Sequence, residues 1–122
     1  MENCIFCKII KGEVATQKVY ENESVLAFIS KEQVSKGHTL VIPKEHFENI
    51  FDISEKALAE VMAVSKELSQ KYQMEFDATG INILHASGKD AQQSVFHFHI
   101  HIVPRYPNDG LDLWIKAGIE KA

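Results

Sequence analysis

Hydrophobic and polar residues alternate strictly along one stretch of this chain, from Ser94 to Pro104. Successive side chains of a β-strand point to opposite faces, so this alternation predicts a strand. His97, His99 and His101 would share one of its faces. The positions between them are apolar and would form the other face: Phe96, Phe98, Ile100 and Ile102. A row of three imidazoles is difficult to explain as packing and indicates a chemical site.

Apolar patterns elsewhere predict the remaining elements of the fold. Apolar runs bounded by turn residues predict four further strands: 18–20, 24–29, 38–43 and 79–85. Apolar residues at helical spacing predict one long helix from Glu55 to about Tyr72, with Ser54 as its N-cap. The apolar stripe of this helix is compatible with packing against the core or against a second subunit.

Short helical segments complete the expected architecture. They are predicted at 5–10, at 45–50 and around Trp114 and Ile115. The strands are joined by short connections that the long helix interrupts once, which favours antiparallel pairing. We therefore expect an α+β fold, a mainly antiparallel five-stranded sheet with the long helix on one face.

Size and charge limit the classes of function. The chain has 122 residues, 45% hydrophobic and 25% charged, which predicts one globular domain spanning residues 1–122. A formal net charge of −4 argues against a nucleic acid polymer as partner, although local donors could still hold a small anionic ligand. No apolar run approaches the length of a membrane span, and Met1-Glu2-Asn3 lacks the features of a signal peptide. We therefore expect a cytoplasmic protein.

The residues alone leave the chemistry of the histidines and cysteines open. A row of imidazoles suits a metal ion such as zinc, copper or nickel, or nucleophilic and acid–base catalysis near neutral pH. Cys4 and Cys7 have the spacing of a zinc-binding or redox thiol pair, or are two buried thiols. The polar loop 86–93 could hold a phosphate through amide and hydroxyl donors, or serve only as a connection.

Three blocks of the chain together resemble the histidine triad (HIT) family. His97 to Val103 is similar to the family signature, His-φ-His-φ-His-φ-φ with φ apolar. Residues 37–46 resemble the second block of the family, and residues 4–10 resemble the opening of its bacterial, Hint-like branch. The resemblance spans about residues 4–106 and leaves 107–122 as a C-terminal tail. It implies a HIT-like fold, usually in a homodimer.

The resemblance also implies an activity. Such proteins are nucleotide hydrolases or transferases that act at the α-phosphate of a purine nucleoside phosphoramidate, a dinucleoside polyphosphate or a related conjugate. The reaction would pass through a covalent nucleotidyl-histidine intermediate and would need no organic cofactor. The alternative is a nucleotide-binding regulatory or adaptor protein with slow or vestigial catalysis. A metalloenzyme built on the triad is a third hypothesis.

Matching positions assign expected roles to the triad. His99 would be the nucleophile, and the backbone carbonyl of His97 would orient its ring. His101 would bind the phosphate and stabilise the charge that develops on it. Three further residues match positions at the same site, the first two in contact with the phosphate and leaving group: Gln93, Ser94 and His38.

The resemblance assigns the cysteines to a metal site. In zinc-containing members, the paired cysteines join two histidines, which in this chain correspond to a set of four residues: Cys4, Cys7, His46 and His97. Two thiolates and two imidazoles suit tetrahedral zinc. Because all four positions would be filled by protein, we expect a structural zinc site and not a catalytic one.

The nucleoside pocket is expected where apolar positions match those that wall the base. With the residue at the ribose position, this set is Ile5, Phe6, Ile9, Phe28, Ile29 and Ser30. Ser30 stands where the family usually has an aspartate that holds the ribose hydroxyls. Ala86 and Ser87 replace a common Asn-Asn pair, and Gln92 replaces a common glycine. These departures leave the nucleophile in place and affect ribose and phosphate binding.

Overall fold

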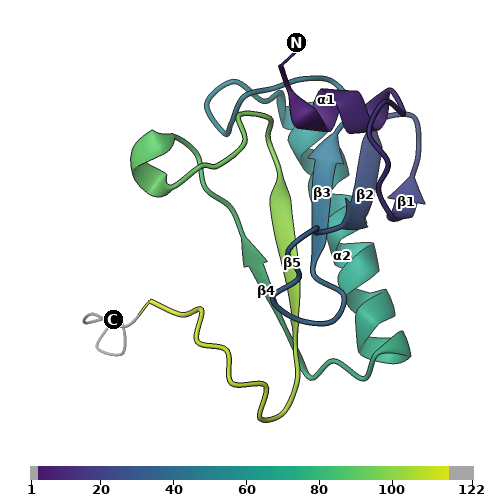
Figure 1. Ribbon diagram of the computed structural model, residues 1–122, viewed down its shortest axis with the longest axis vertical. Coiled ribbons are helices and arrows are strands. Elements are labelled where there is room, and N and C mark those ends of the chain that lie inside the picture. The colour runs from purple at the N-terminus through teal and green to yellow at the C-terminus, as the bar shows by residue number, and fades with distance from the viewer. Residues whose placement is uncertain (1–2, 116–122) are drawn as a thin grey trace.

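One five-stranded sheet and one long helix form the framework of the fold (Figure 1). The computed structural model describes residues 3–115. Its elements in chain order are α1 (Ile5–Ile10), β1 (Lys18–Glu21), β2 (Val25–Ile29), β3 (Thr39–Pro43), α2 (Glu55–Glu75), β4 (Gly80–Leu84), the 3-10 helix η1 (Lys89–Ala91) and β5 (Ile100–Arg105). In the view of Figure 1, α2 runs behind the strands and α1 lies at the top.

Every pairing in the sheet is antiparallel, and the strand order is β1-β2-β3-β5-β4. The tight β1–β2 turn is held by Asn22, whose side-chain oxygen accepts from the backbone N–H groups of Ser24 and Val25, both at 2.8 Å. The chain passes from β3 through α2 to β4, and the last strand, β5, then lies between β3 and β4 in the sheet. Leu40 and Leu84 are therefore both opposite His101. The α+β fold expected from the sequence is confirmed.

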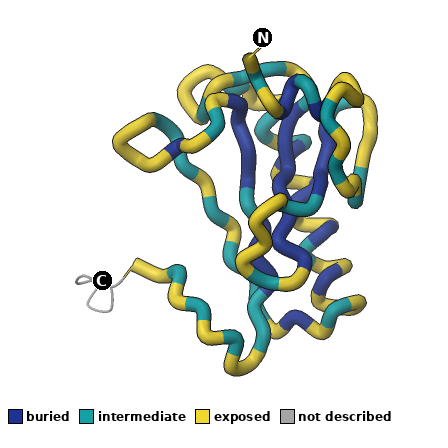
Figure 2. Tube along the Cα trace, viewed as in Figure 1, coloured by how far each residue is buried: buried dark blue, intermediate teal, exposed yellow. Residues whose placement is uncertain are grey.

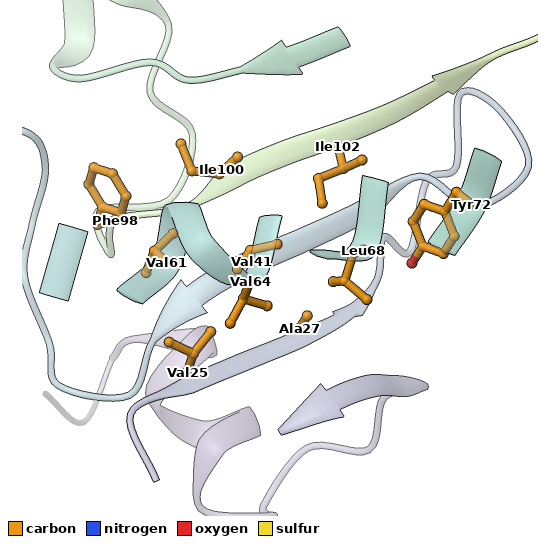
Figure 3. Packing of buried hydrophobic residues seen from close by; sticks show 10 residues of the cluster. All are labelled: Val25, Ala27, Val41, Val61, Val64, Leu68, Tyr72, Phe98, Ile100 and Ile102. Carbon is orange, nitrogen blue, oxygen red and sulfur yellow. The ribbon is translucent and has the colours of Figure 1, made fainter. Parts of the chain in front are cut away.

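Both faces of the central strands are covered, which explains why β2 and β3 read as unbroken apolar runs. One face packs against α2 and forms a buried cluster (Figure 3): Val25, Ala27, Val41, Val61, Val64, Leu68, Tyr72, Phe98, Ile100 and Ile102. The other face packs against α1 and forms a second cluster: Phe6, Ile9, Leu26, Phe28, Leu40 and Ile42. Figure 2 shows the resulting dark band of buried strands between exposed loops.

The long helix forms as expected and buries one side. The hydroxyl of Ser54 accepts from the N–H of Ala57 at 3.1 Å, which caps the first turn. Met62 is 38% exposed, so it is not on the face of α2 that packs against the sheet. Among the helices within residues 3–115, none is long and apolar enough to cross a lipid bilayer.

The histidine strand starts later than its alternation predicts. Ladder pairing begins at Ile100, and residues 94–99 have no regular structure. The N–H of Phe98 donates instead to the carbonyl of Phe47 at 2.7 Å, which draws this part of the chain to the segment after β3. Phe96, expected on the apolar face, is 43% exposed. The prediction of two faces nevertheless holds from Phe98 onward, because Phe98, Ile100 and Ile102 all contact the α2 side.

Two predicted short helices do not have the expected form. Residues 45–50 are irregular, because the Asp52 carboxylate accepts from the N–H groups of Glu48 and Asn49 and so replaces helical acceptors. Trp114 and Ile115 are not helical and are about two-thirds exposed. The rest of the predicted terminal helix lies outside the described residues.

Gly37 lies two residues before the start of β3, where the core is tightly packed. It has φ +91°, and an added Cβ would lie 2.9 Å from the Phe76 ring and 3.2 Å from Pro104. We expect Gly37→Ala to lower the free energy of unfolding by about 2–4 kcal/mol, from backbone strain and overpacking together. Gly12→Ala is the matched control, because Gly12 has φ +79° and nothing within 4 Å, so only the backbone cost of about 1–2 kcal/mol applies. Equal losses in urea titrations of both variants would contradict the steric argument.

Candidate functional site

The six histidines of the chain form one connected group around the start of β5. Ring centroids lie 4.8 Å apart for His46 and His97, 5.1 Å apart for His99 and His101, and 5.3 Å apart for His38 and His101. A hydrogen bond joins the ring of His99 to the backbone of His97, and His85 contacts the backbone of His99. One histidine of β5 and five from the segments before β3, after β3, after β4 and before β5 therefore meet at one place.

His99 is oriented by its own segment of backbone. Its Nδ1–H donates to the carbonyl of His97 at 2.8 Å, which leaves Nε2 with a free lone pair. Burial lowers the pKa of His99 below its usual value, and the His97 carbonyl opposes this shift only in part. The Phe6 ring packs edge-on at 5.2 Å. His99 is thus a buried, neutral imidazole with one nitrogen able to attack an electrophile.

A hydrogen-bond relay sets the tautomer of His101. The N–H of Val34 donates to Nδ1 of His38 at 3.2 Å, so the proton of this neutral ring is on Nε2. That Nε2–H donates to Nδ1 of His101 at 3.0 Å, so His101 in turn carries its proton on Nε2. Burial, followed by the neighbouring His99, His38 and His85, lowers the pKa of His101 to about 4. His101 therefore offers a neutral N–H donor.

A cavity of about 870 Å³ lies on the α1 side of the sheet and is lined by both His99 and His101. It gathers all six residues of the expected nucleoside pocket: Ile5, Phe6, Ile9, Phe28, Ile29 and Ser30. His38 and Ser94 also line it, as do Leu40 and Val95, which sequence reasoning did not single out. Leu40 could have been found from the alternation, because it lies two residues after His38 and therefore faces the same side. The cavity therefore has an apolar part and a part that carries imidazole and hydroxyl groups.

Gln93 is placed differently from Ser94. It is buried and does not line the cavity, and its side chain is fully engaged within the protein. Its amide nitrogen donates to the carbonyls of Glu48 and Val95 at 2.7 and 3.1 Å, and its oxygen accepts from the N–H of Gly88 at 2.7 Å. In this arrangement Gln93 shapes the loop that presents Ser94, and a direct contact between Gln93 and phosphate stays a prediction.

The loop before Ser94 contains two residues with positive φ. Gly88 has φ 95° and ψ 155°, a region that essentially only glycine adopts. Gln92 has φ 72° and ψ 31°, the left-handed conformation that favours glycine. The glycine expected at position 92 from the resemblance would thus fit the backbone with less strain than the glutamine present.

Four side chains converge around Nδ1 of the His97 ring: Cys4, Cys7, His46 and His97 itself. Their ligand atoms all lie within 4.8 Å of one another. Nδ1 of His97 is 3.4 Å from Sγ of Cys4, 3.6 Å from Sγ of Cys7 and 3.1 Å from Nδ1 of His46. Tetrahedral zinc with N and S ligands would separate neighbouring ligand atoms by about 3.3–3.8 Å, so these spacings suit the ion.

The hydrogen bond made by the other ring nitrogen of His97 also supports a metal site. Its Nε2–H donates to the carbonyl of Pro43 at 2.8 Å, which leaves Nδ1 as the free ligand atom. Burial and the neighbouring Cys4 thiol raise the pKa of Cys7 to about 11, and a bound divalent cation would reverse this by stabilising the thiolate. The cluster can hold a metal, and its burial and four protein ligands suit a structural role.

His85 is the member of the group that sequence reasoning missed. Its Nδ1 lies 2.9 Å from the carbonyl oxygen of His99, and its Nε2 lies 2.5 Å from the hydroxyl of Ser87. The only signal was its residue type at the end of a predicted strand. The contact with His99 arises because β4 and β5 are adjacent in the sheet.

Comparison with known proteins gives a consistent result. The family model for the HIT domain matches residues 11–108. The chain is 49% identical over 105 residues to "Protein hit" of Bacillus subtilis, covering 86% of this chain and 72% of that protein. It is 37% identical over 113 residues to "Adenosine 5'-monophosphoramidase hnt1" of Schizosaccharomyces pombe, covering 93% and 81%. A crystal structure of a Zn-bound histidine triad family protein from Mycobacterium smegmatis is similar with a TM-score of 0.88 at 34% identity, covering 98% and 87%.

Proposed function

Because the chain belongs to the HIT family, we propose that it is a hydrolase or transferase of nucleotides that acts at the α-phosphate through His99. The observation that carries the proposal is the buried, neutral imidazole of His99, whose Nδ1–H is held by the His97 carbonyl while Nε2 stays free. A purine nucleoside phosphoramidate is the substrate class that the S. pombe relative supports by its name. Dinucleoside polyphosphates and related conjugates share the same reacting group.

The chemistry takes two displacements. Nε2 of His99 attacks the α-phosphorus, a P–N bond forms, and the bond to the leaving nitrogen or oxygen breaks while the leaving group takes up a proton from the solvent. Water then attacks the phosphorus and releases a proton to the solvent, the P–N bond breaks, and the electron pair returns to Nε2. The N–H of His101 and the hydroxyl of Ser94 line the same cavity and stabilise the negative charge that grows on the phosphoryl oxygens.

The apolar part of the cavity would hold the base. Phe6 and Phe28 meet edge to face at 5.6 Å and form a rigid wall with Ile5 and Ile9. Ser30 would face the ribose with a neutral hydroxyl, a weaker partner than a carboxylate. This arrangement supports a nucleoside site with a reduced preference for the ribose hydroxyls.

The Cys/His cluster would hold structural zinc through Cys4, Cys7, His46 and His97. When bound, the ion supplies folding free energy by joining α1 to the segment before β5. His97 would then have two roles: its ring Nδ1 would bind the ion, and its carbonyl accepts the hydrogen bond from His99. The relative from M. smegmatis, a Zn-bound protein, supports this assignment.

A homodimer is the proposed assembly. Within the described residues, β4 lies at an edge of the sheet and pairs only with β5. Its Ile83 is 43% exposed, and Met62 on α2 is 38% exposed. An edge strand with apolar side chains is a surface that another copy can cover.

Intact mass spectrometry of the protein quenched during turnover of adenosine 5'-phosphoramidate tests the mechanism. We expect a fraction of the protein to carry one covalent AMP, because the two displacements are separated by the nucleotidyl-histidine intermediate. Peptide mapping should place the adduct on His99. Inversion of configuration at a chirally labelled α-phosphorus, together with no adduct at any quench time, would contradict the covalent route, because two successive displacements give net retention. Binding without product or adduct would favour the nucleotide-binding regulatory role.

A further inference from the structure

The three residues from His97 to His99 carry the site but lie outside the ladder of the sheet. Strand β5 begins only at Ile100. On the β3 side, the N–H of Phe98 donates to the carbonyl of Phe47 at 2.7 Å, and the His97 ring donates to the carbonyl of Pro43 at 2.8 Å. These bonds hold one side of the segment. The carbonyl of His99 faces the other side, where the last β4–β5 pair is Leu84 with His101.

His85 supplies the bond on that other side. It directly follows β4, and its ring takes the place of the backbone donor that a longer β4 would offer to the His99 carbonyl, at 2.9 Å. The ring also packs on the buried Phe98 ring, with centroids 4.5 Å apart and planes 31° apart. The segment is thus held between β4 and the chain that follows β3.

Ser87 orients this ring. The N–H of Ile50 donates to the Ser87 hydroxyl at 2.9 Å, so the hydroxyl proton is free to donate to Nε2 of His85 at 2.5 Å. In the neutral ring the proton is then on Nδ1, the atom that lies within hydrogen-bond distance of the His99 carbonyl. The relay runs from Ile50 through Ser87 and His85 to the backbone of His99 and joins the segment after β3 to the segment after β4.

We propose that His85, oriented by Ser87, is a positioning residue that fixes the backbone of His99 and thereby the direction of its Nε2 toward the phosphorus. This inference rests on the proposed function, since its effect on rate requires His99 to be the nucleophile. His85 does not line the cavity in which the nucleotide would bind. Its effect should therefore appear in the rate of nucleotidyl transfer and leave nucleotide affinity unchanged.

Two variants separate the hydrogen bond from the packing. His85→Asn keeps an N–H donor near the position of Nδ1 but removes the ring, whereas His85→Phe keeps a ring on Phe98 and removes the donor. We expect the single-turnover rate of adenylyl transfer from adenosine 5'-phosphoramidate to fall about five- to tenfold in His85→Phe, the effect of losing about one hydrogen bond. In His85→Asn we expect it to stay within about twofold. The dissociation constant of AMP should stay within about twofold in both. Ser87→Ala should lower the rate about threefold, because the ring keeps its donor but loses its orientation.

Equal losses in both His85 variants, or no loss in His85→Phe, would overturn the proposal, as would a change confined to AMP affinity. Nuclear magnetic resonance provides a readout independent of turnover. The ¹³C resonance of the His99 carbonyl should shift upfield in His85→Phe and stay in place in His85→Asn, and ¹⁵N spectra should show the Nδ1–H tautomer of His85. If the wild-type protein shows no turnover, the proposed function fails, and the carbonyl shift alone decides whether the His85 bond exists.

Discussion

Replacing His99 with asparagine is expected to lower kcat/KM for an adenosine phosphoramidate by at least about 10³-fold, roughly 4 kcal/mol of transition-state free energy. Asparagine can still donate from its amide to the His97 carbonyl, the bond that the Nδ1–H makes at 2.8 Å, but it has no atom that can attack. His99→Ala should show the same loss. Steady-state kinetics with each variant provide the measurement.

The control for this prediction is ligand binding. His99 is only one of the residues that line the cavity, so calorimetry with AMP should show affinity within about tenfold of wild type for both variants. Their thermal unfolding should also stay close to wild type, because His99 lies at the cavity and outside the two apolar clusters. Wild-type hydrolysis by either variant would exclude His99 as the nucleophile.

Replacing Cys7 with serine is expected to remove bound zinc and to lower the free energy of unfolding by at least about 3–4 kcal/mol. Metal bound only by the folded state stabilises it by about 4 kcal/mol when its concentration is a thousand times Kd. Cys7 is buried between Cys4 and His46, with Sγ 3.3 Å from the His46 Nδ1, so a hydroxyl in its place is a poor ligand with little room to move. Metal content should fall from about one ion per chain to a small fraction, and Tm should fall by more than about 10 °C.

Chelation serves as the matched control for this second prediction. A strong chelator should lower the Tm of the wild-type protein to near that of Cys7→Ser and leave the variant unchanged, because the variant has no ion to lose. His46→Ala should behave like Cys7→Ser. A Cys7→Ser variant that retains both its metal and its fold but loses activity would count against a structural role. Wild-type activity that survives complete removal of the ion would argue against a metalloenzyme.

Local pattern was enough to indicate α1, α2 and the five strands, and to assign the faces of the strands. A strand places alternate residues on opposite sides wherever it lies, so the period of two put Ile100 and Ile102 with the core and His99 and His101 on the cavity side. The apolar stripe and Ser54 likewise predicted α2, because both act within a few residues. The apolar runs of β2 and β3 indicated burial on both faces.

Tertiary contacts decided what the pattern could not. The strand starts at Ile100 because Phe47 takes the N–H of Phe98, and residues 45–50 form no helix because Asp52 binds their amides. The amide of Gln93 donates to backbone groups that include the distant carbonyl of Glu48, a contact that the sequence pattern did not indicate. Each of these outcomes depends on which hydrogen-bond partner the tertiary structure places next to a given donor or acceptor.

The sequence by itself determined the candidate reactive group, three histidines in a strand-like pattern, and through its resemblance the four candidate metal ligands. Only the tertiary structure brought Cys7 to His46 across 39 positions and Cys4 to His97 across 93. It also placed His85 against the backbone of His99, the proposed nucleophile, because the β4 ladder ends at Leu84. Local periodicity determines which side a residue faces, whereas the convergence of distant segments follows from sheet order and packing.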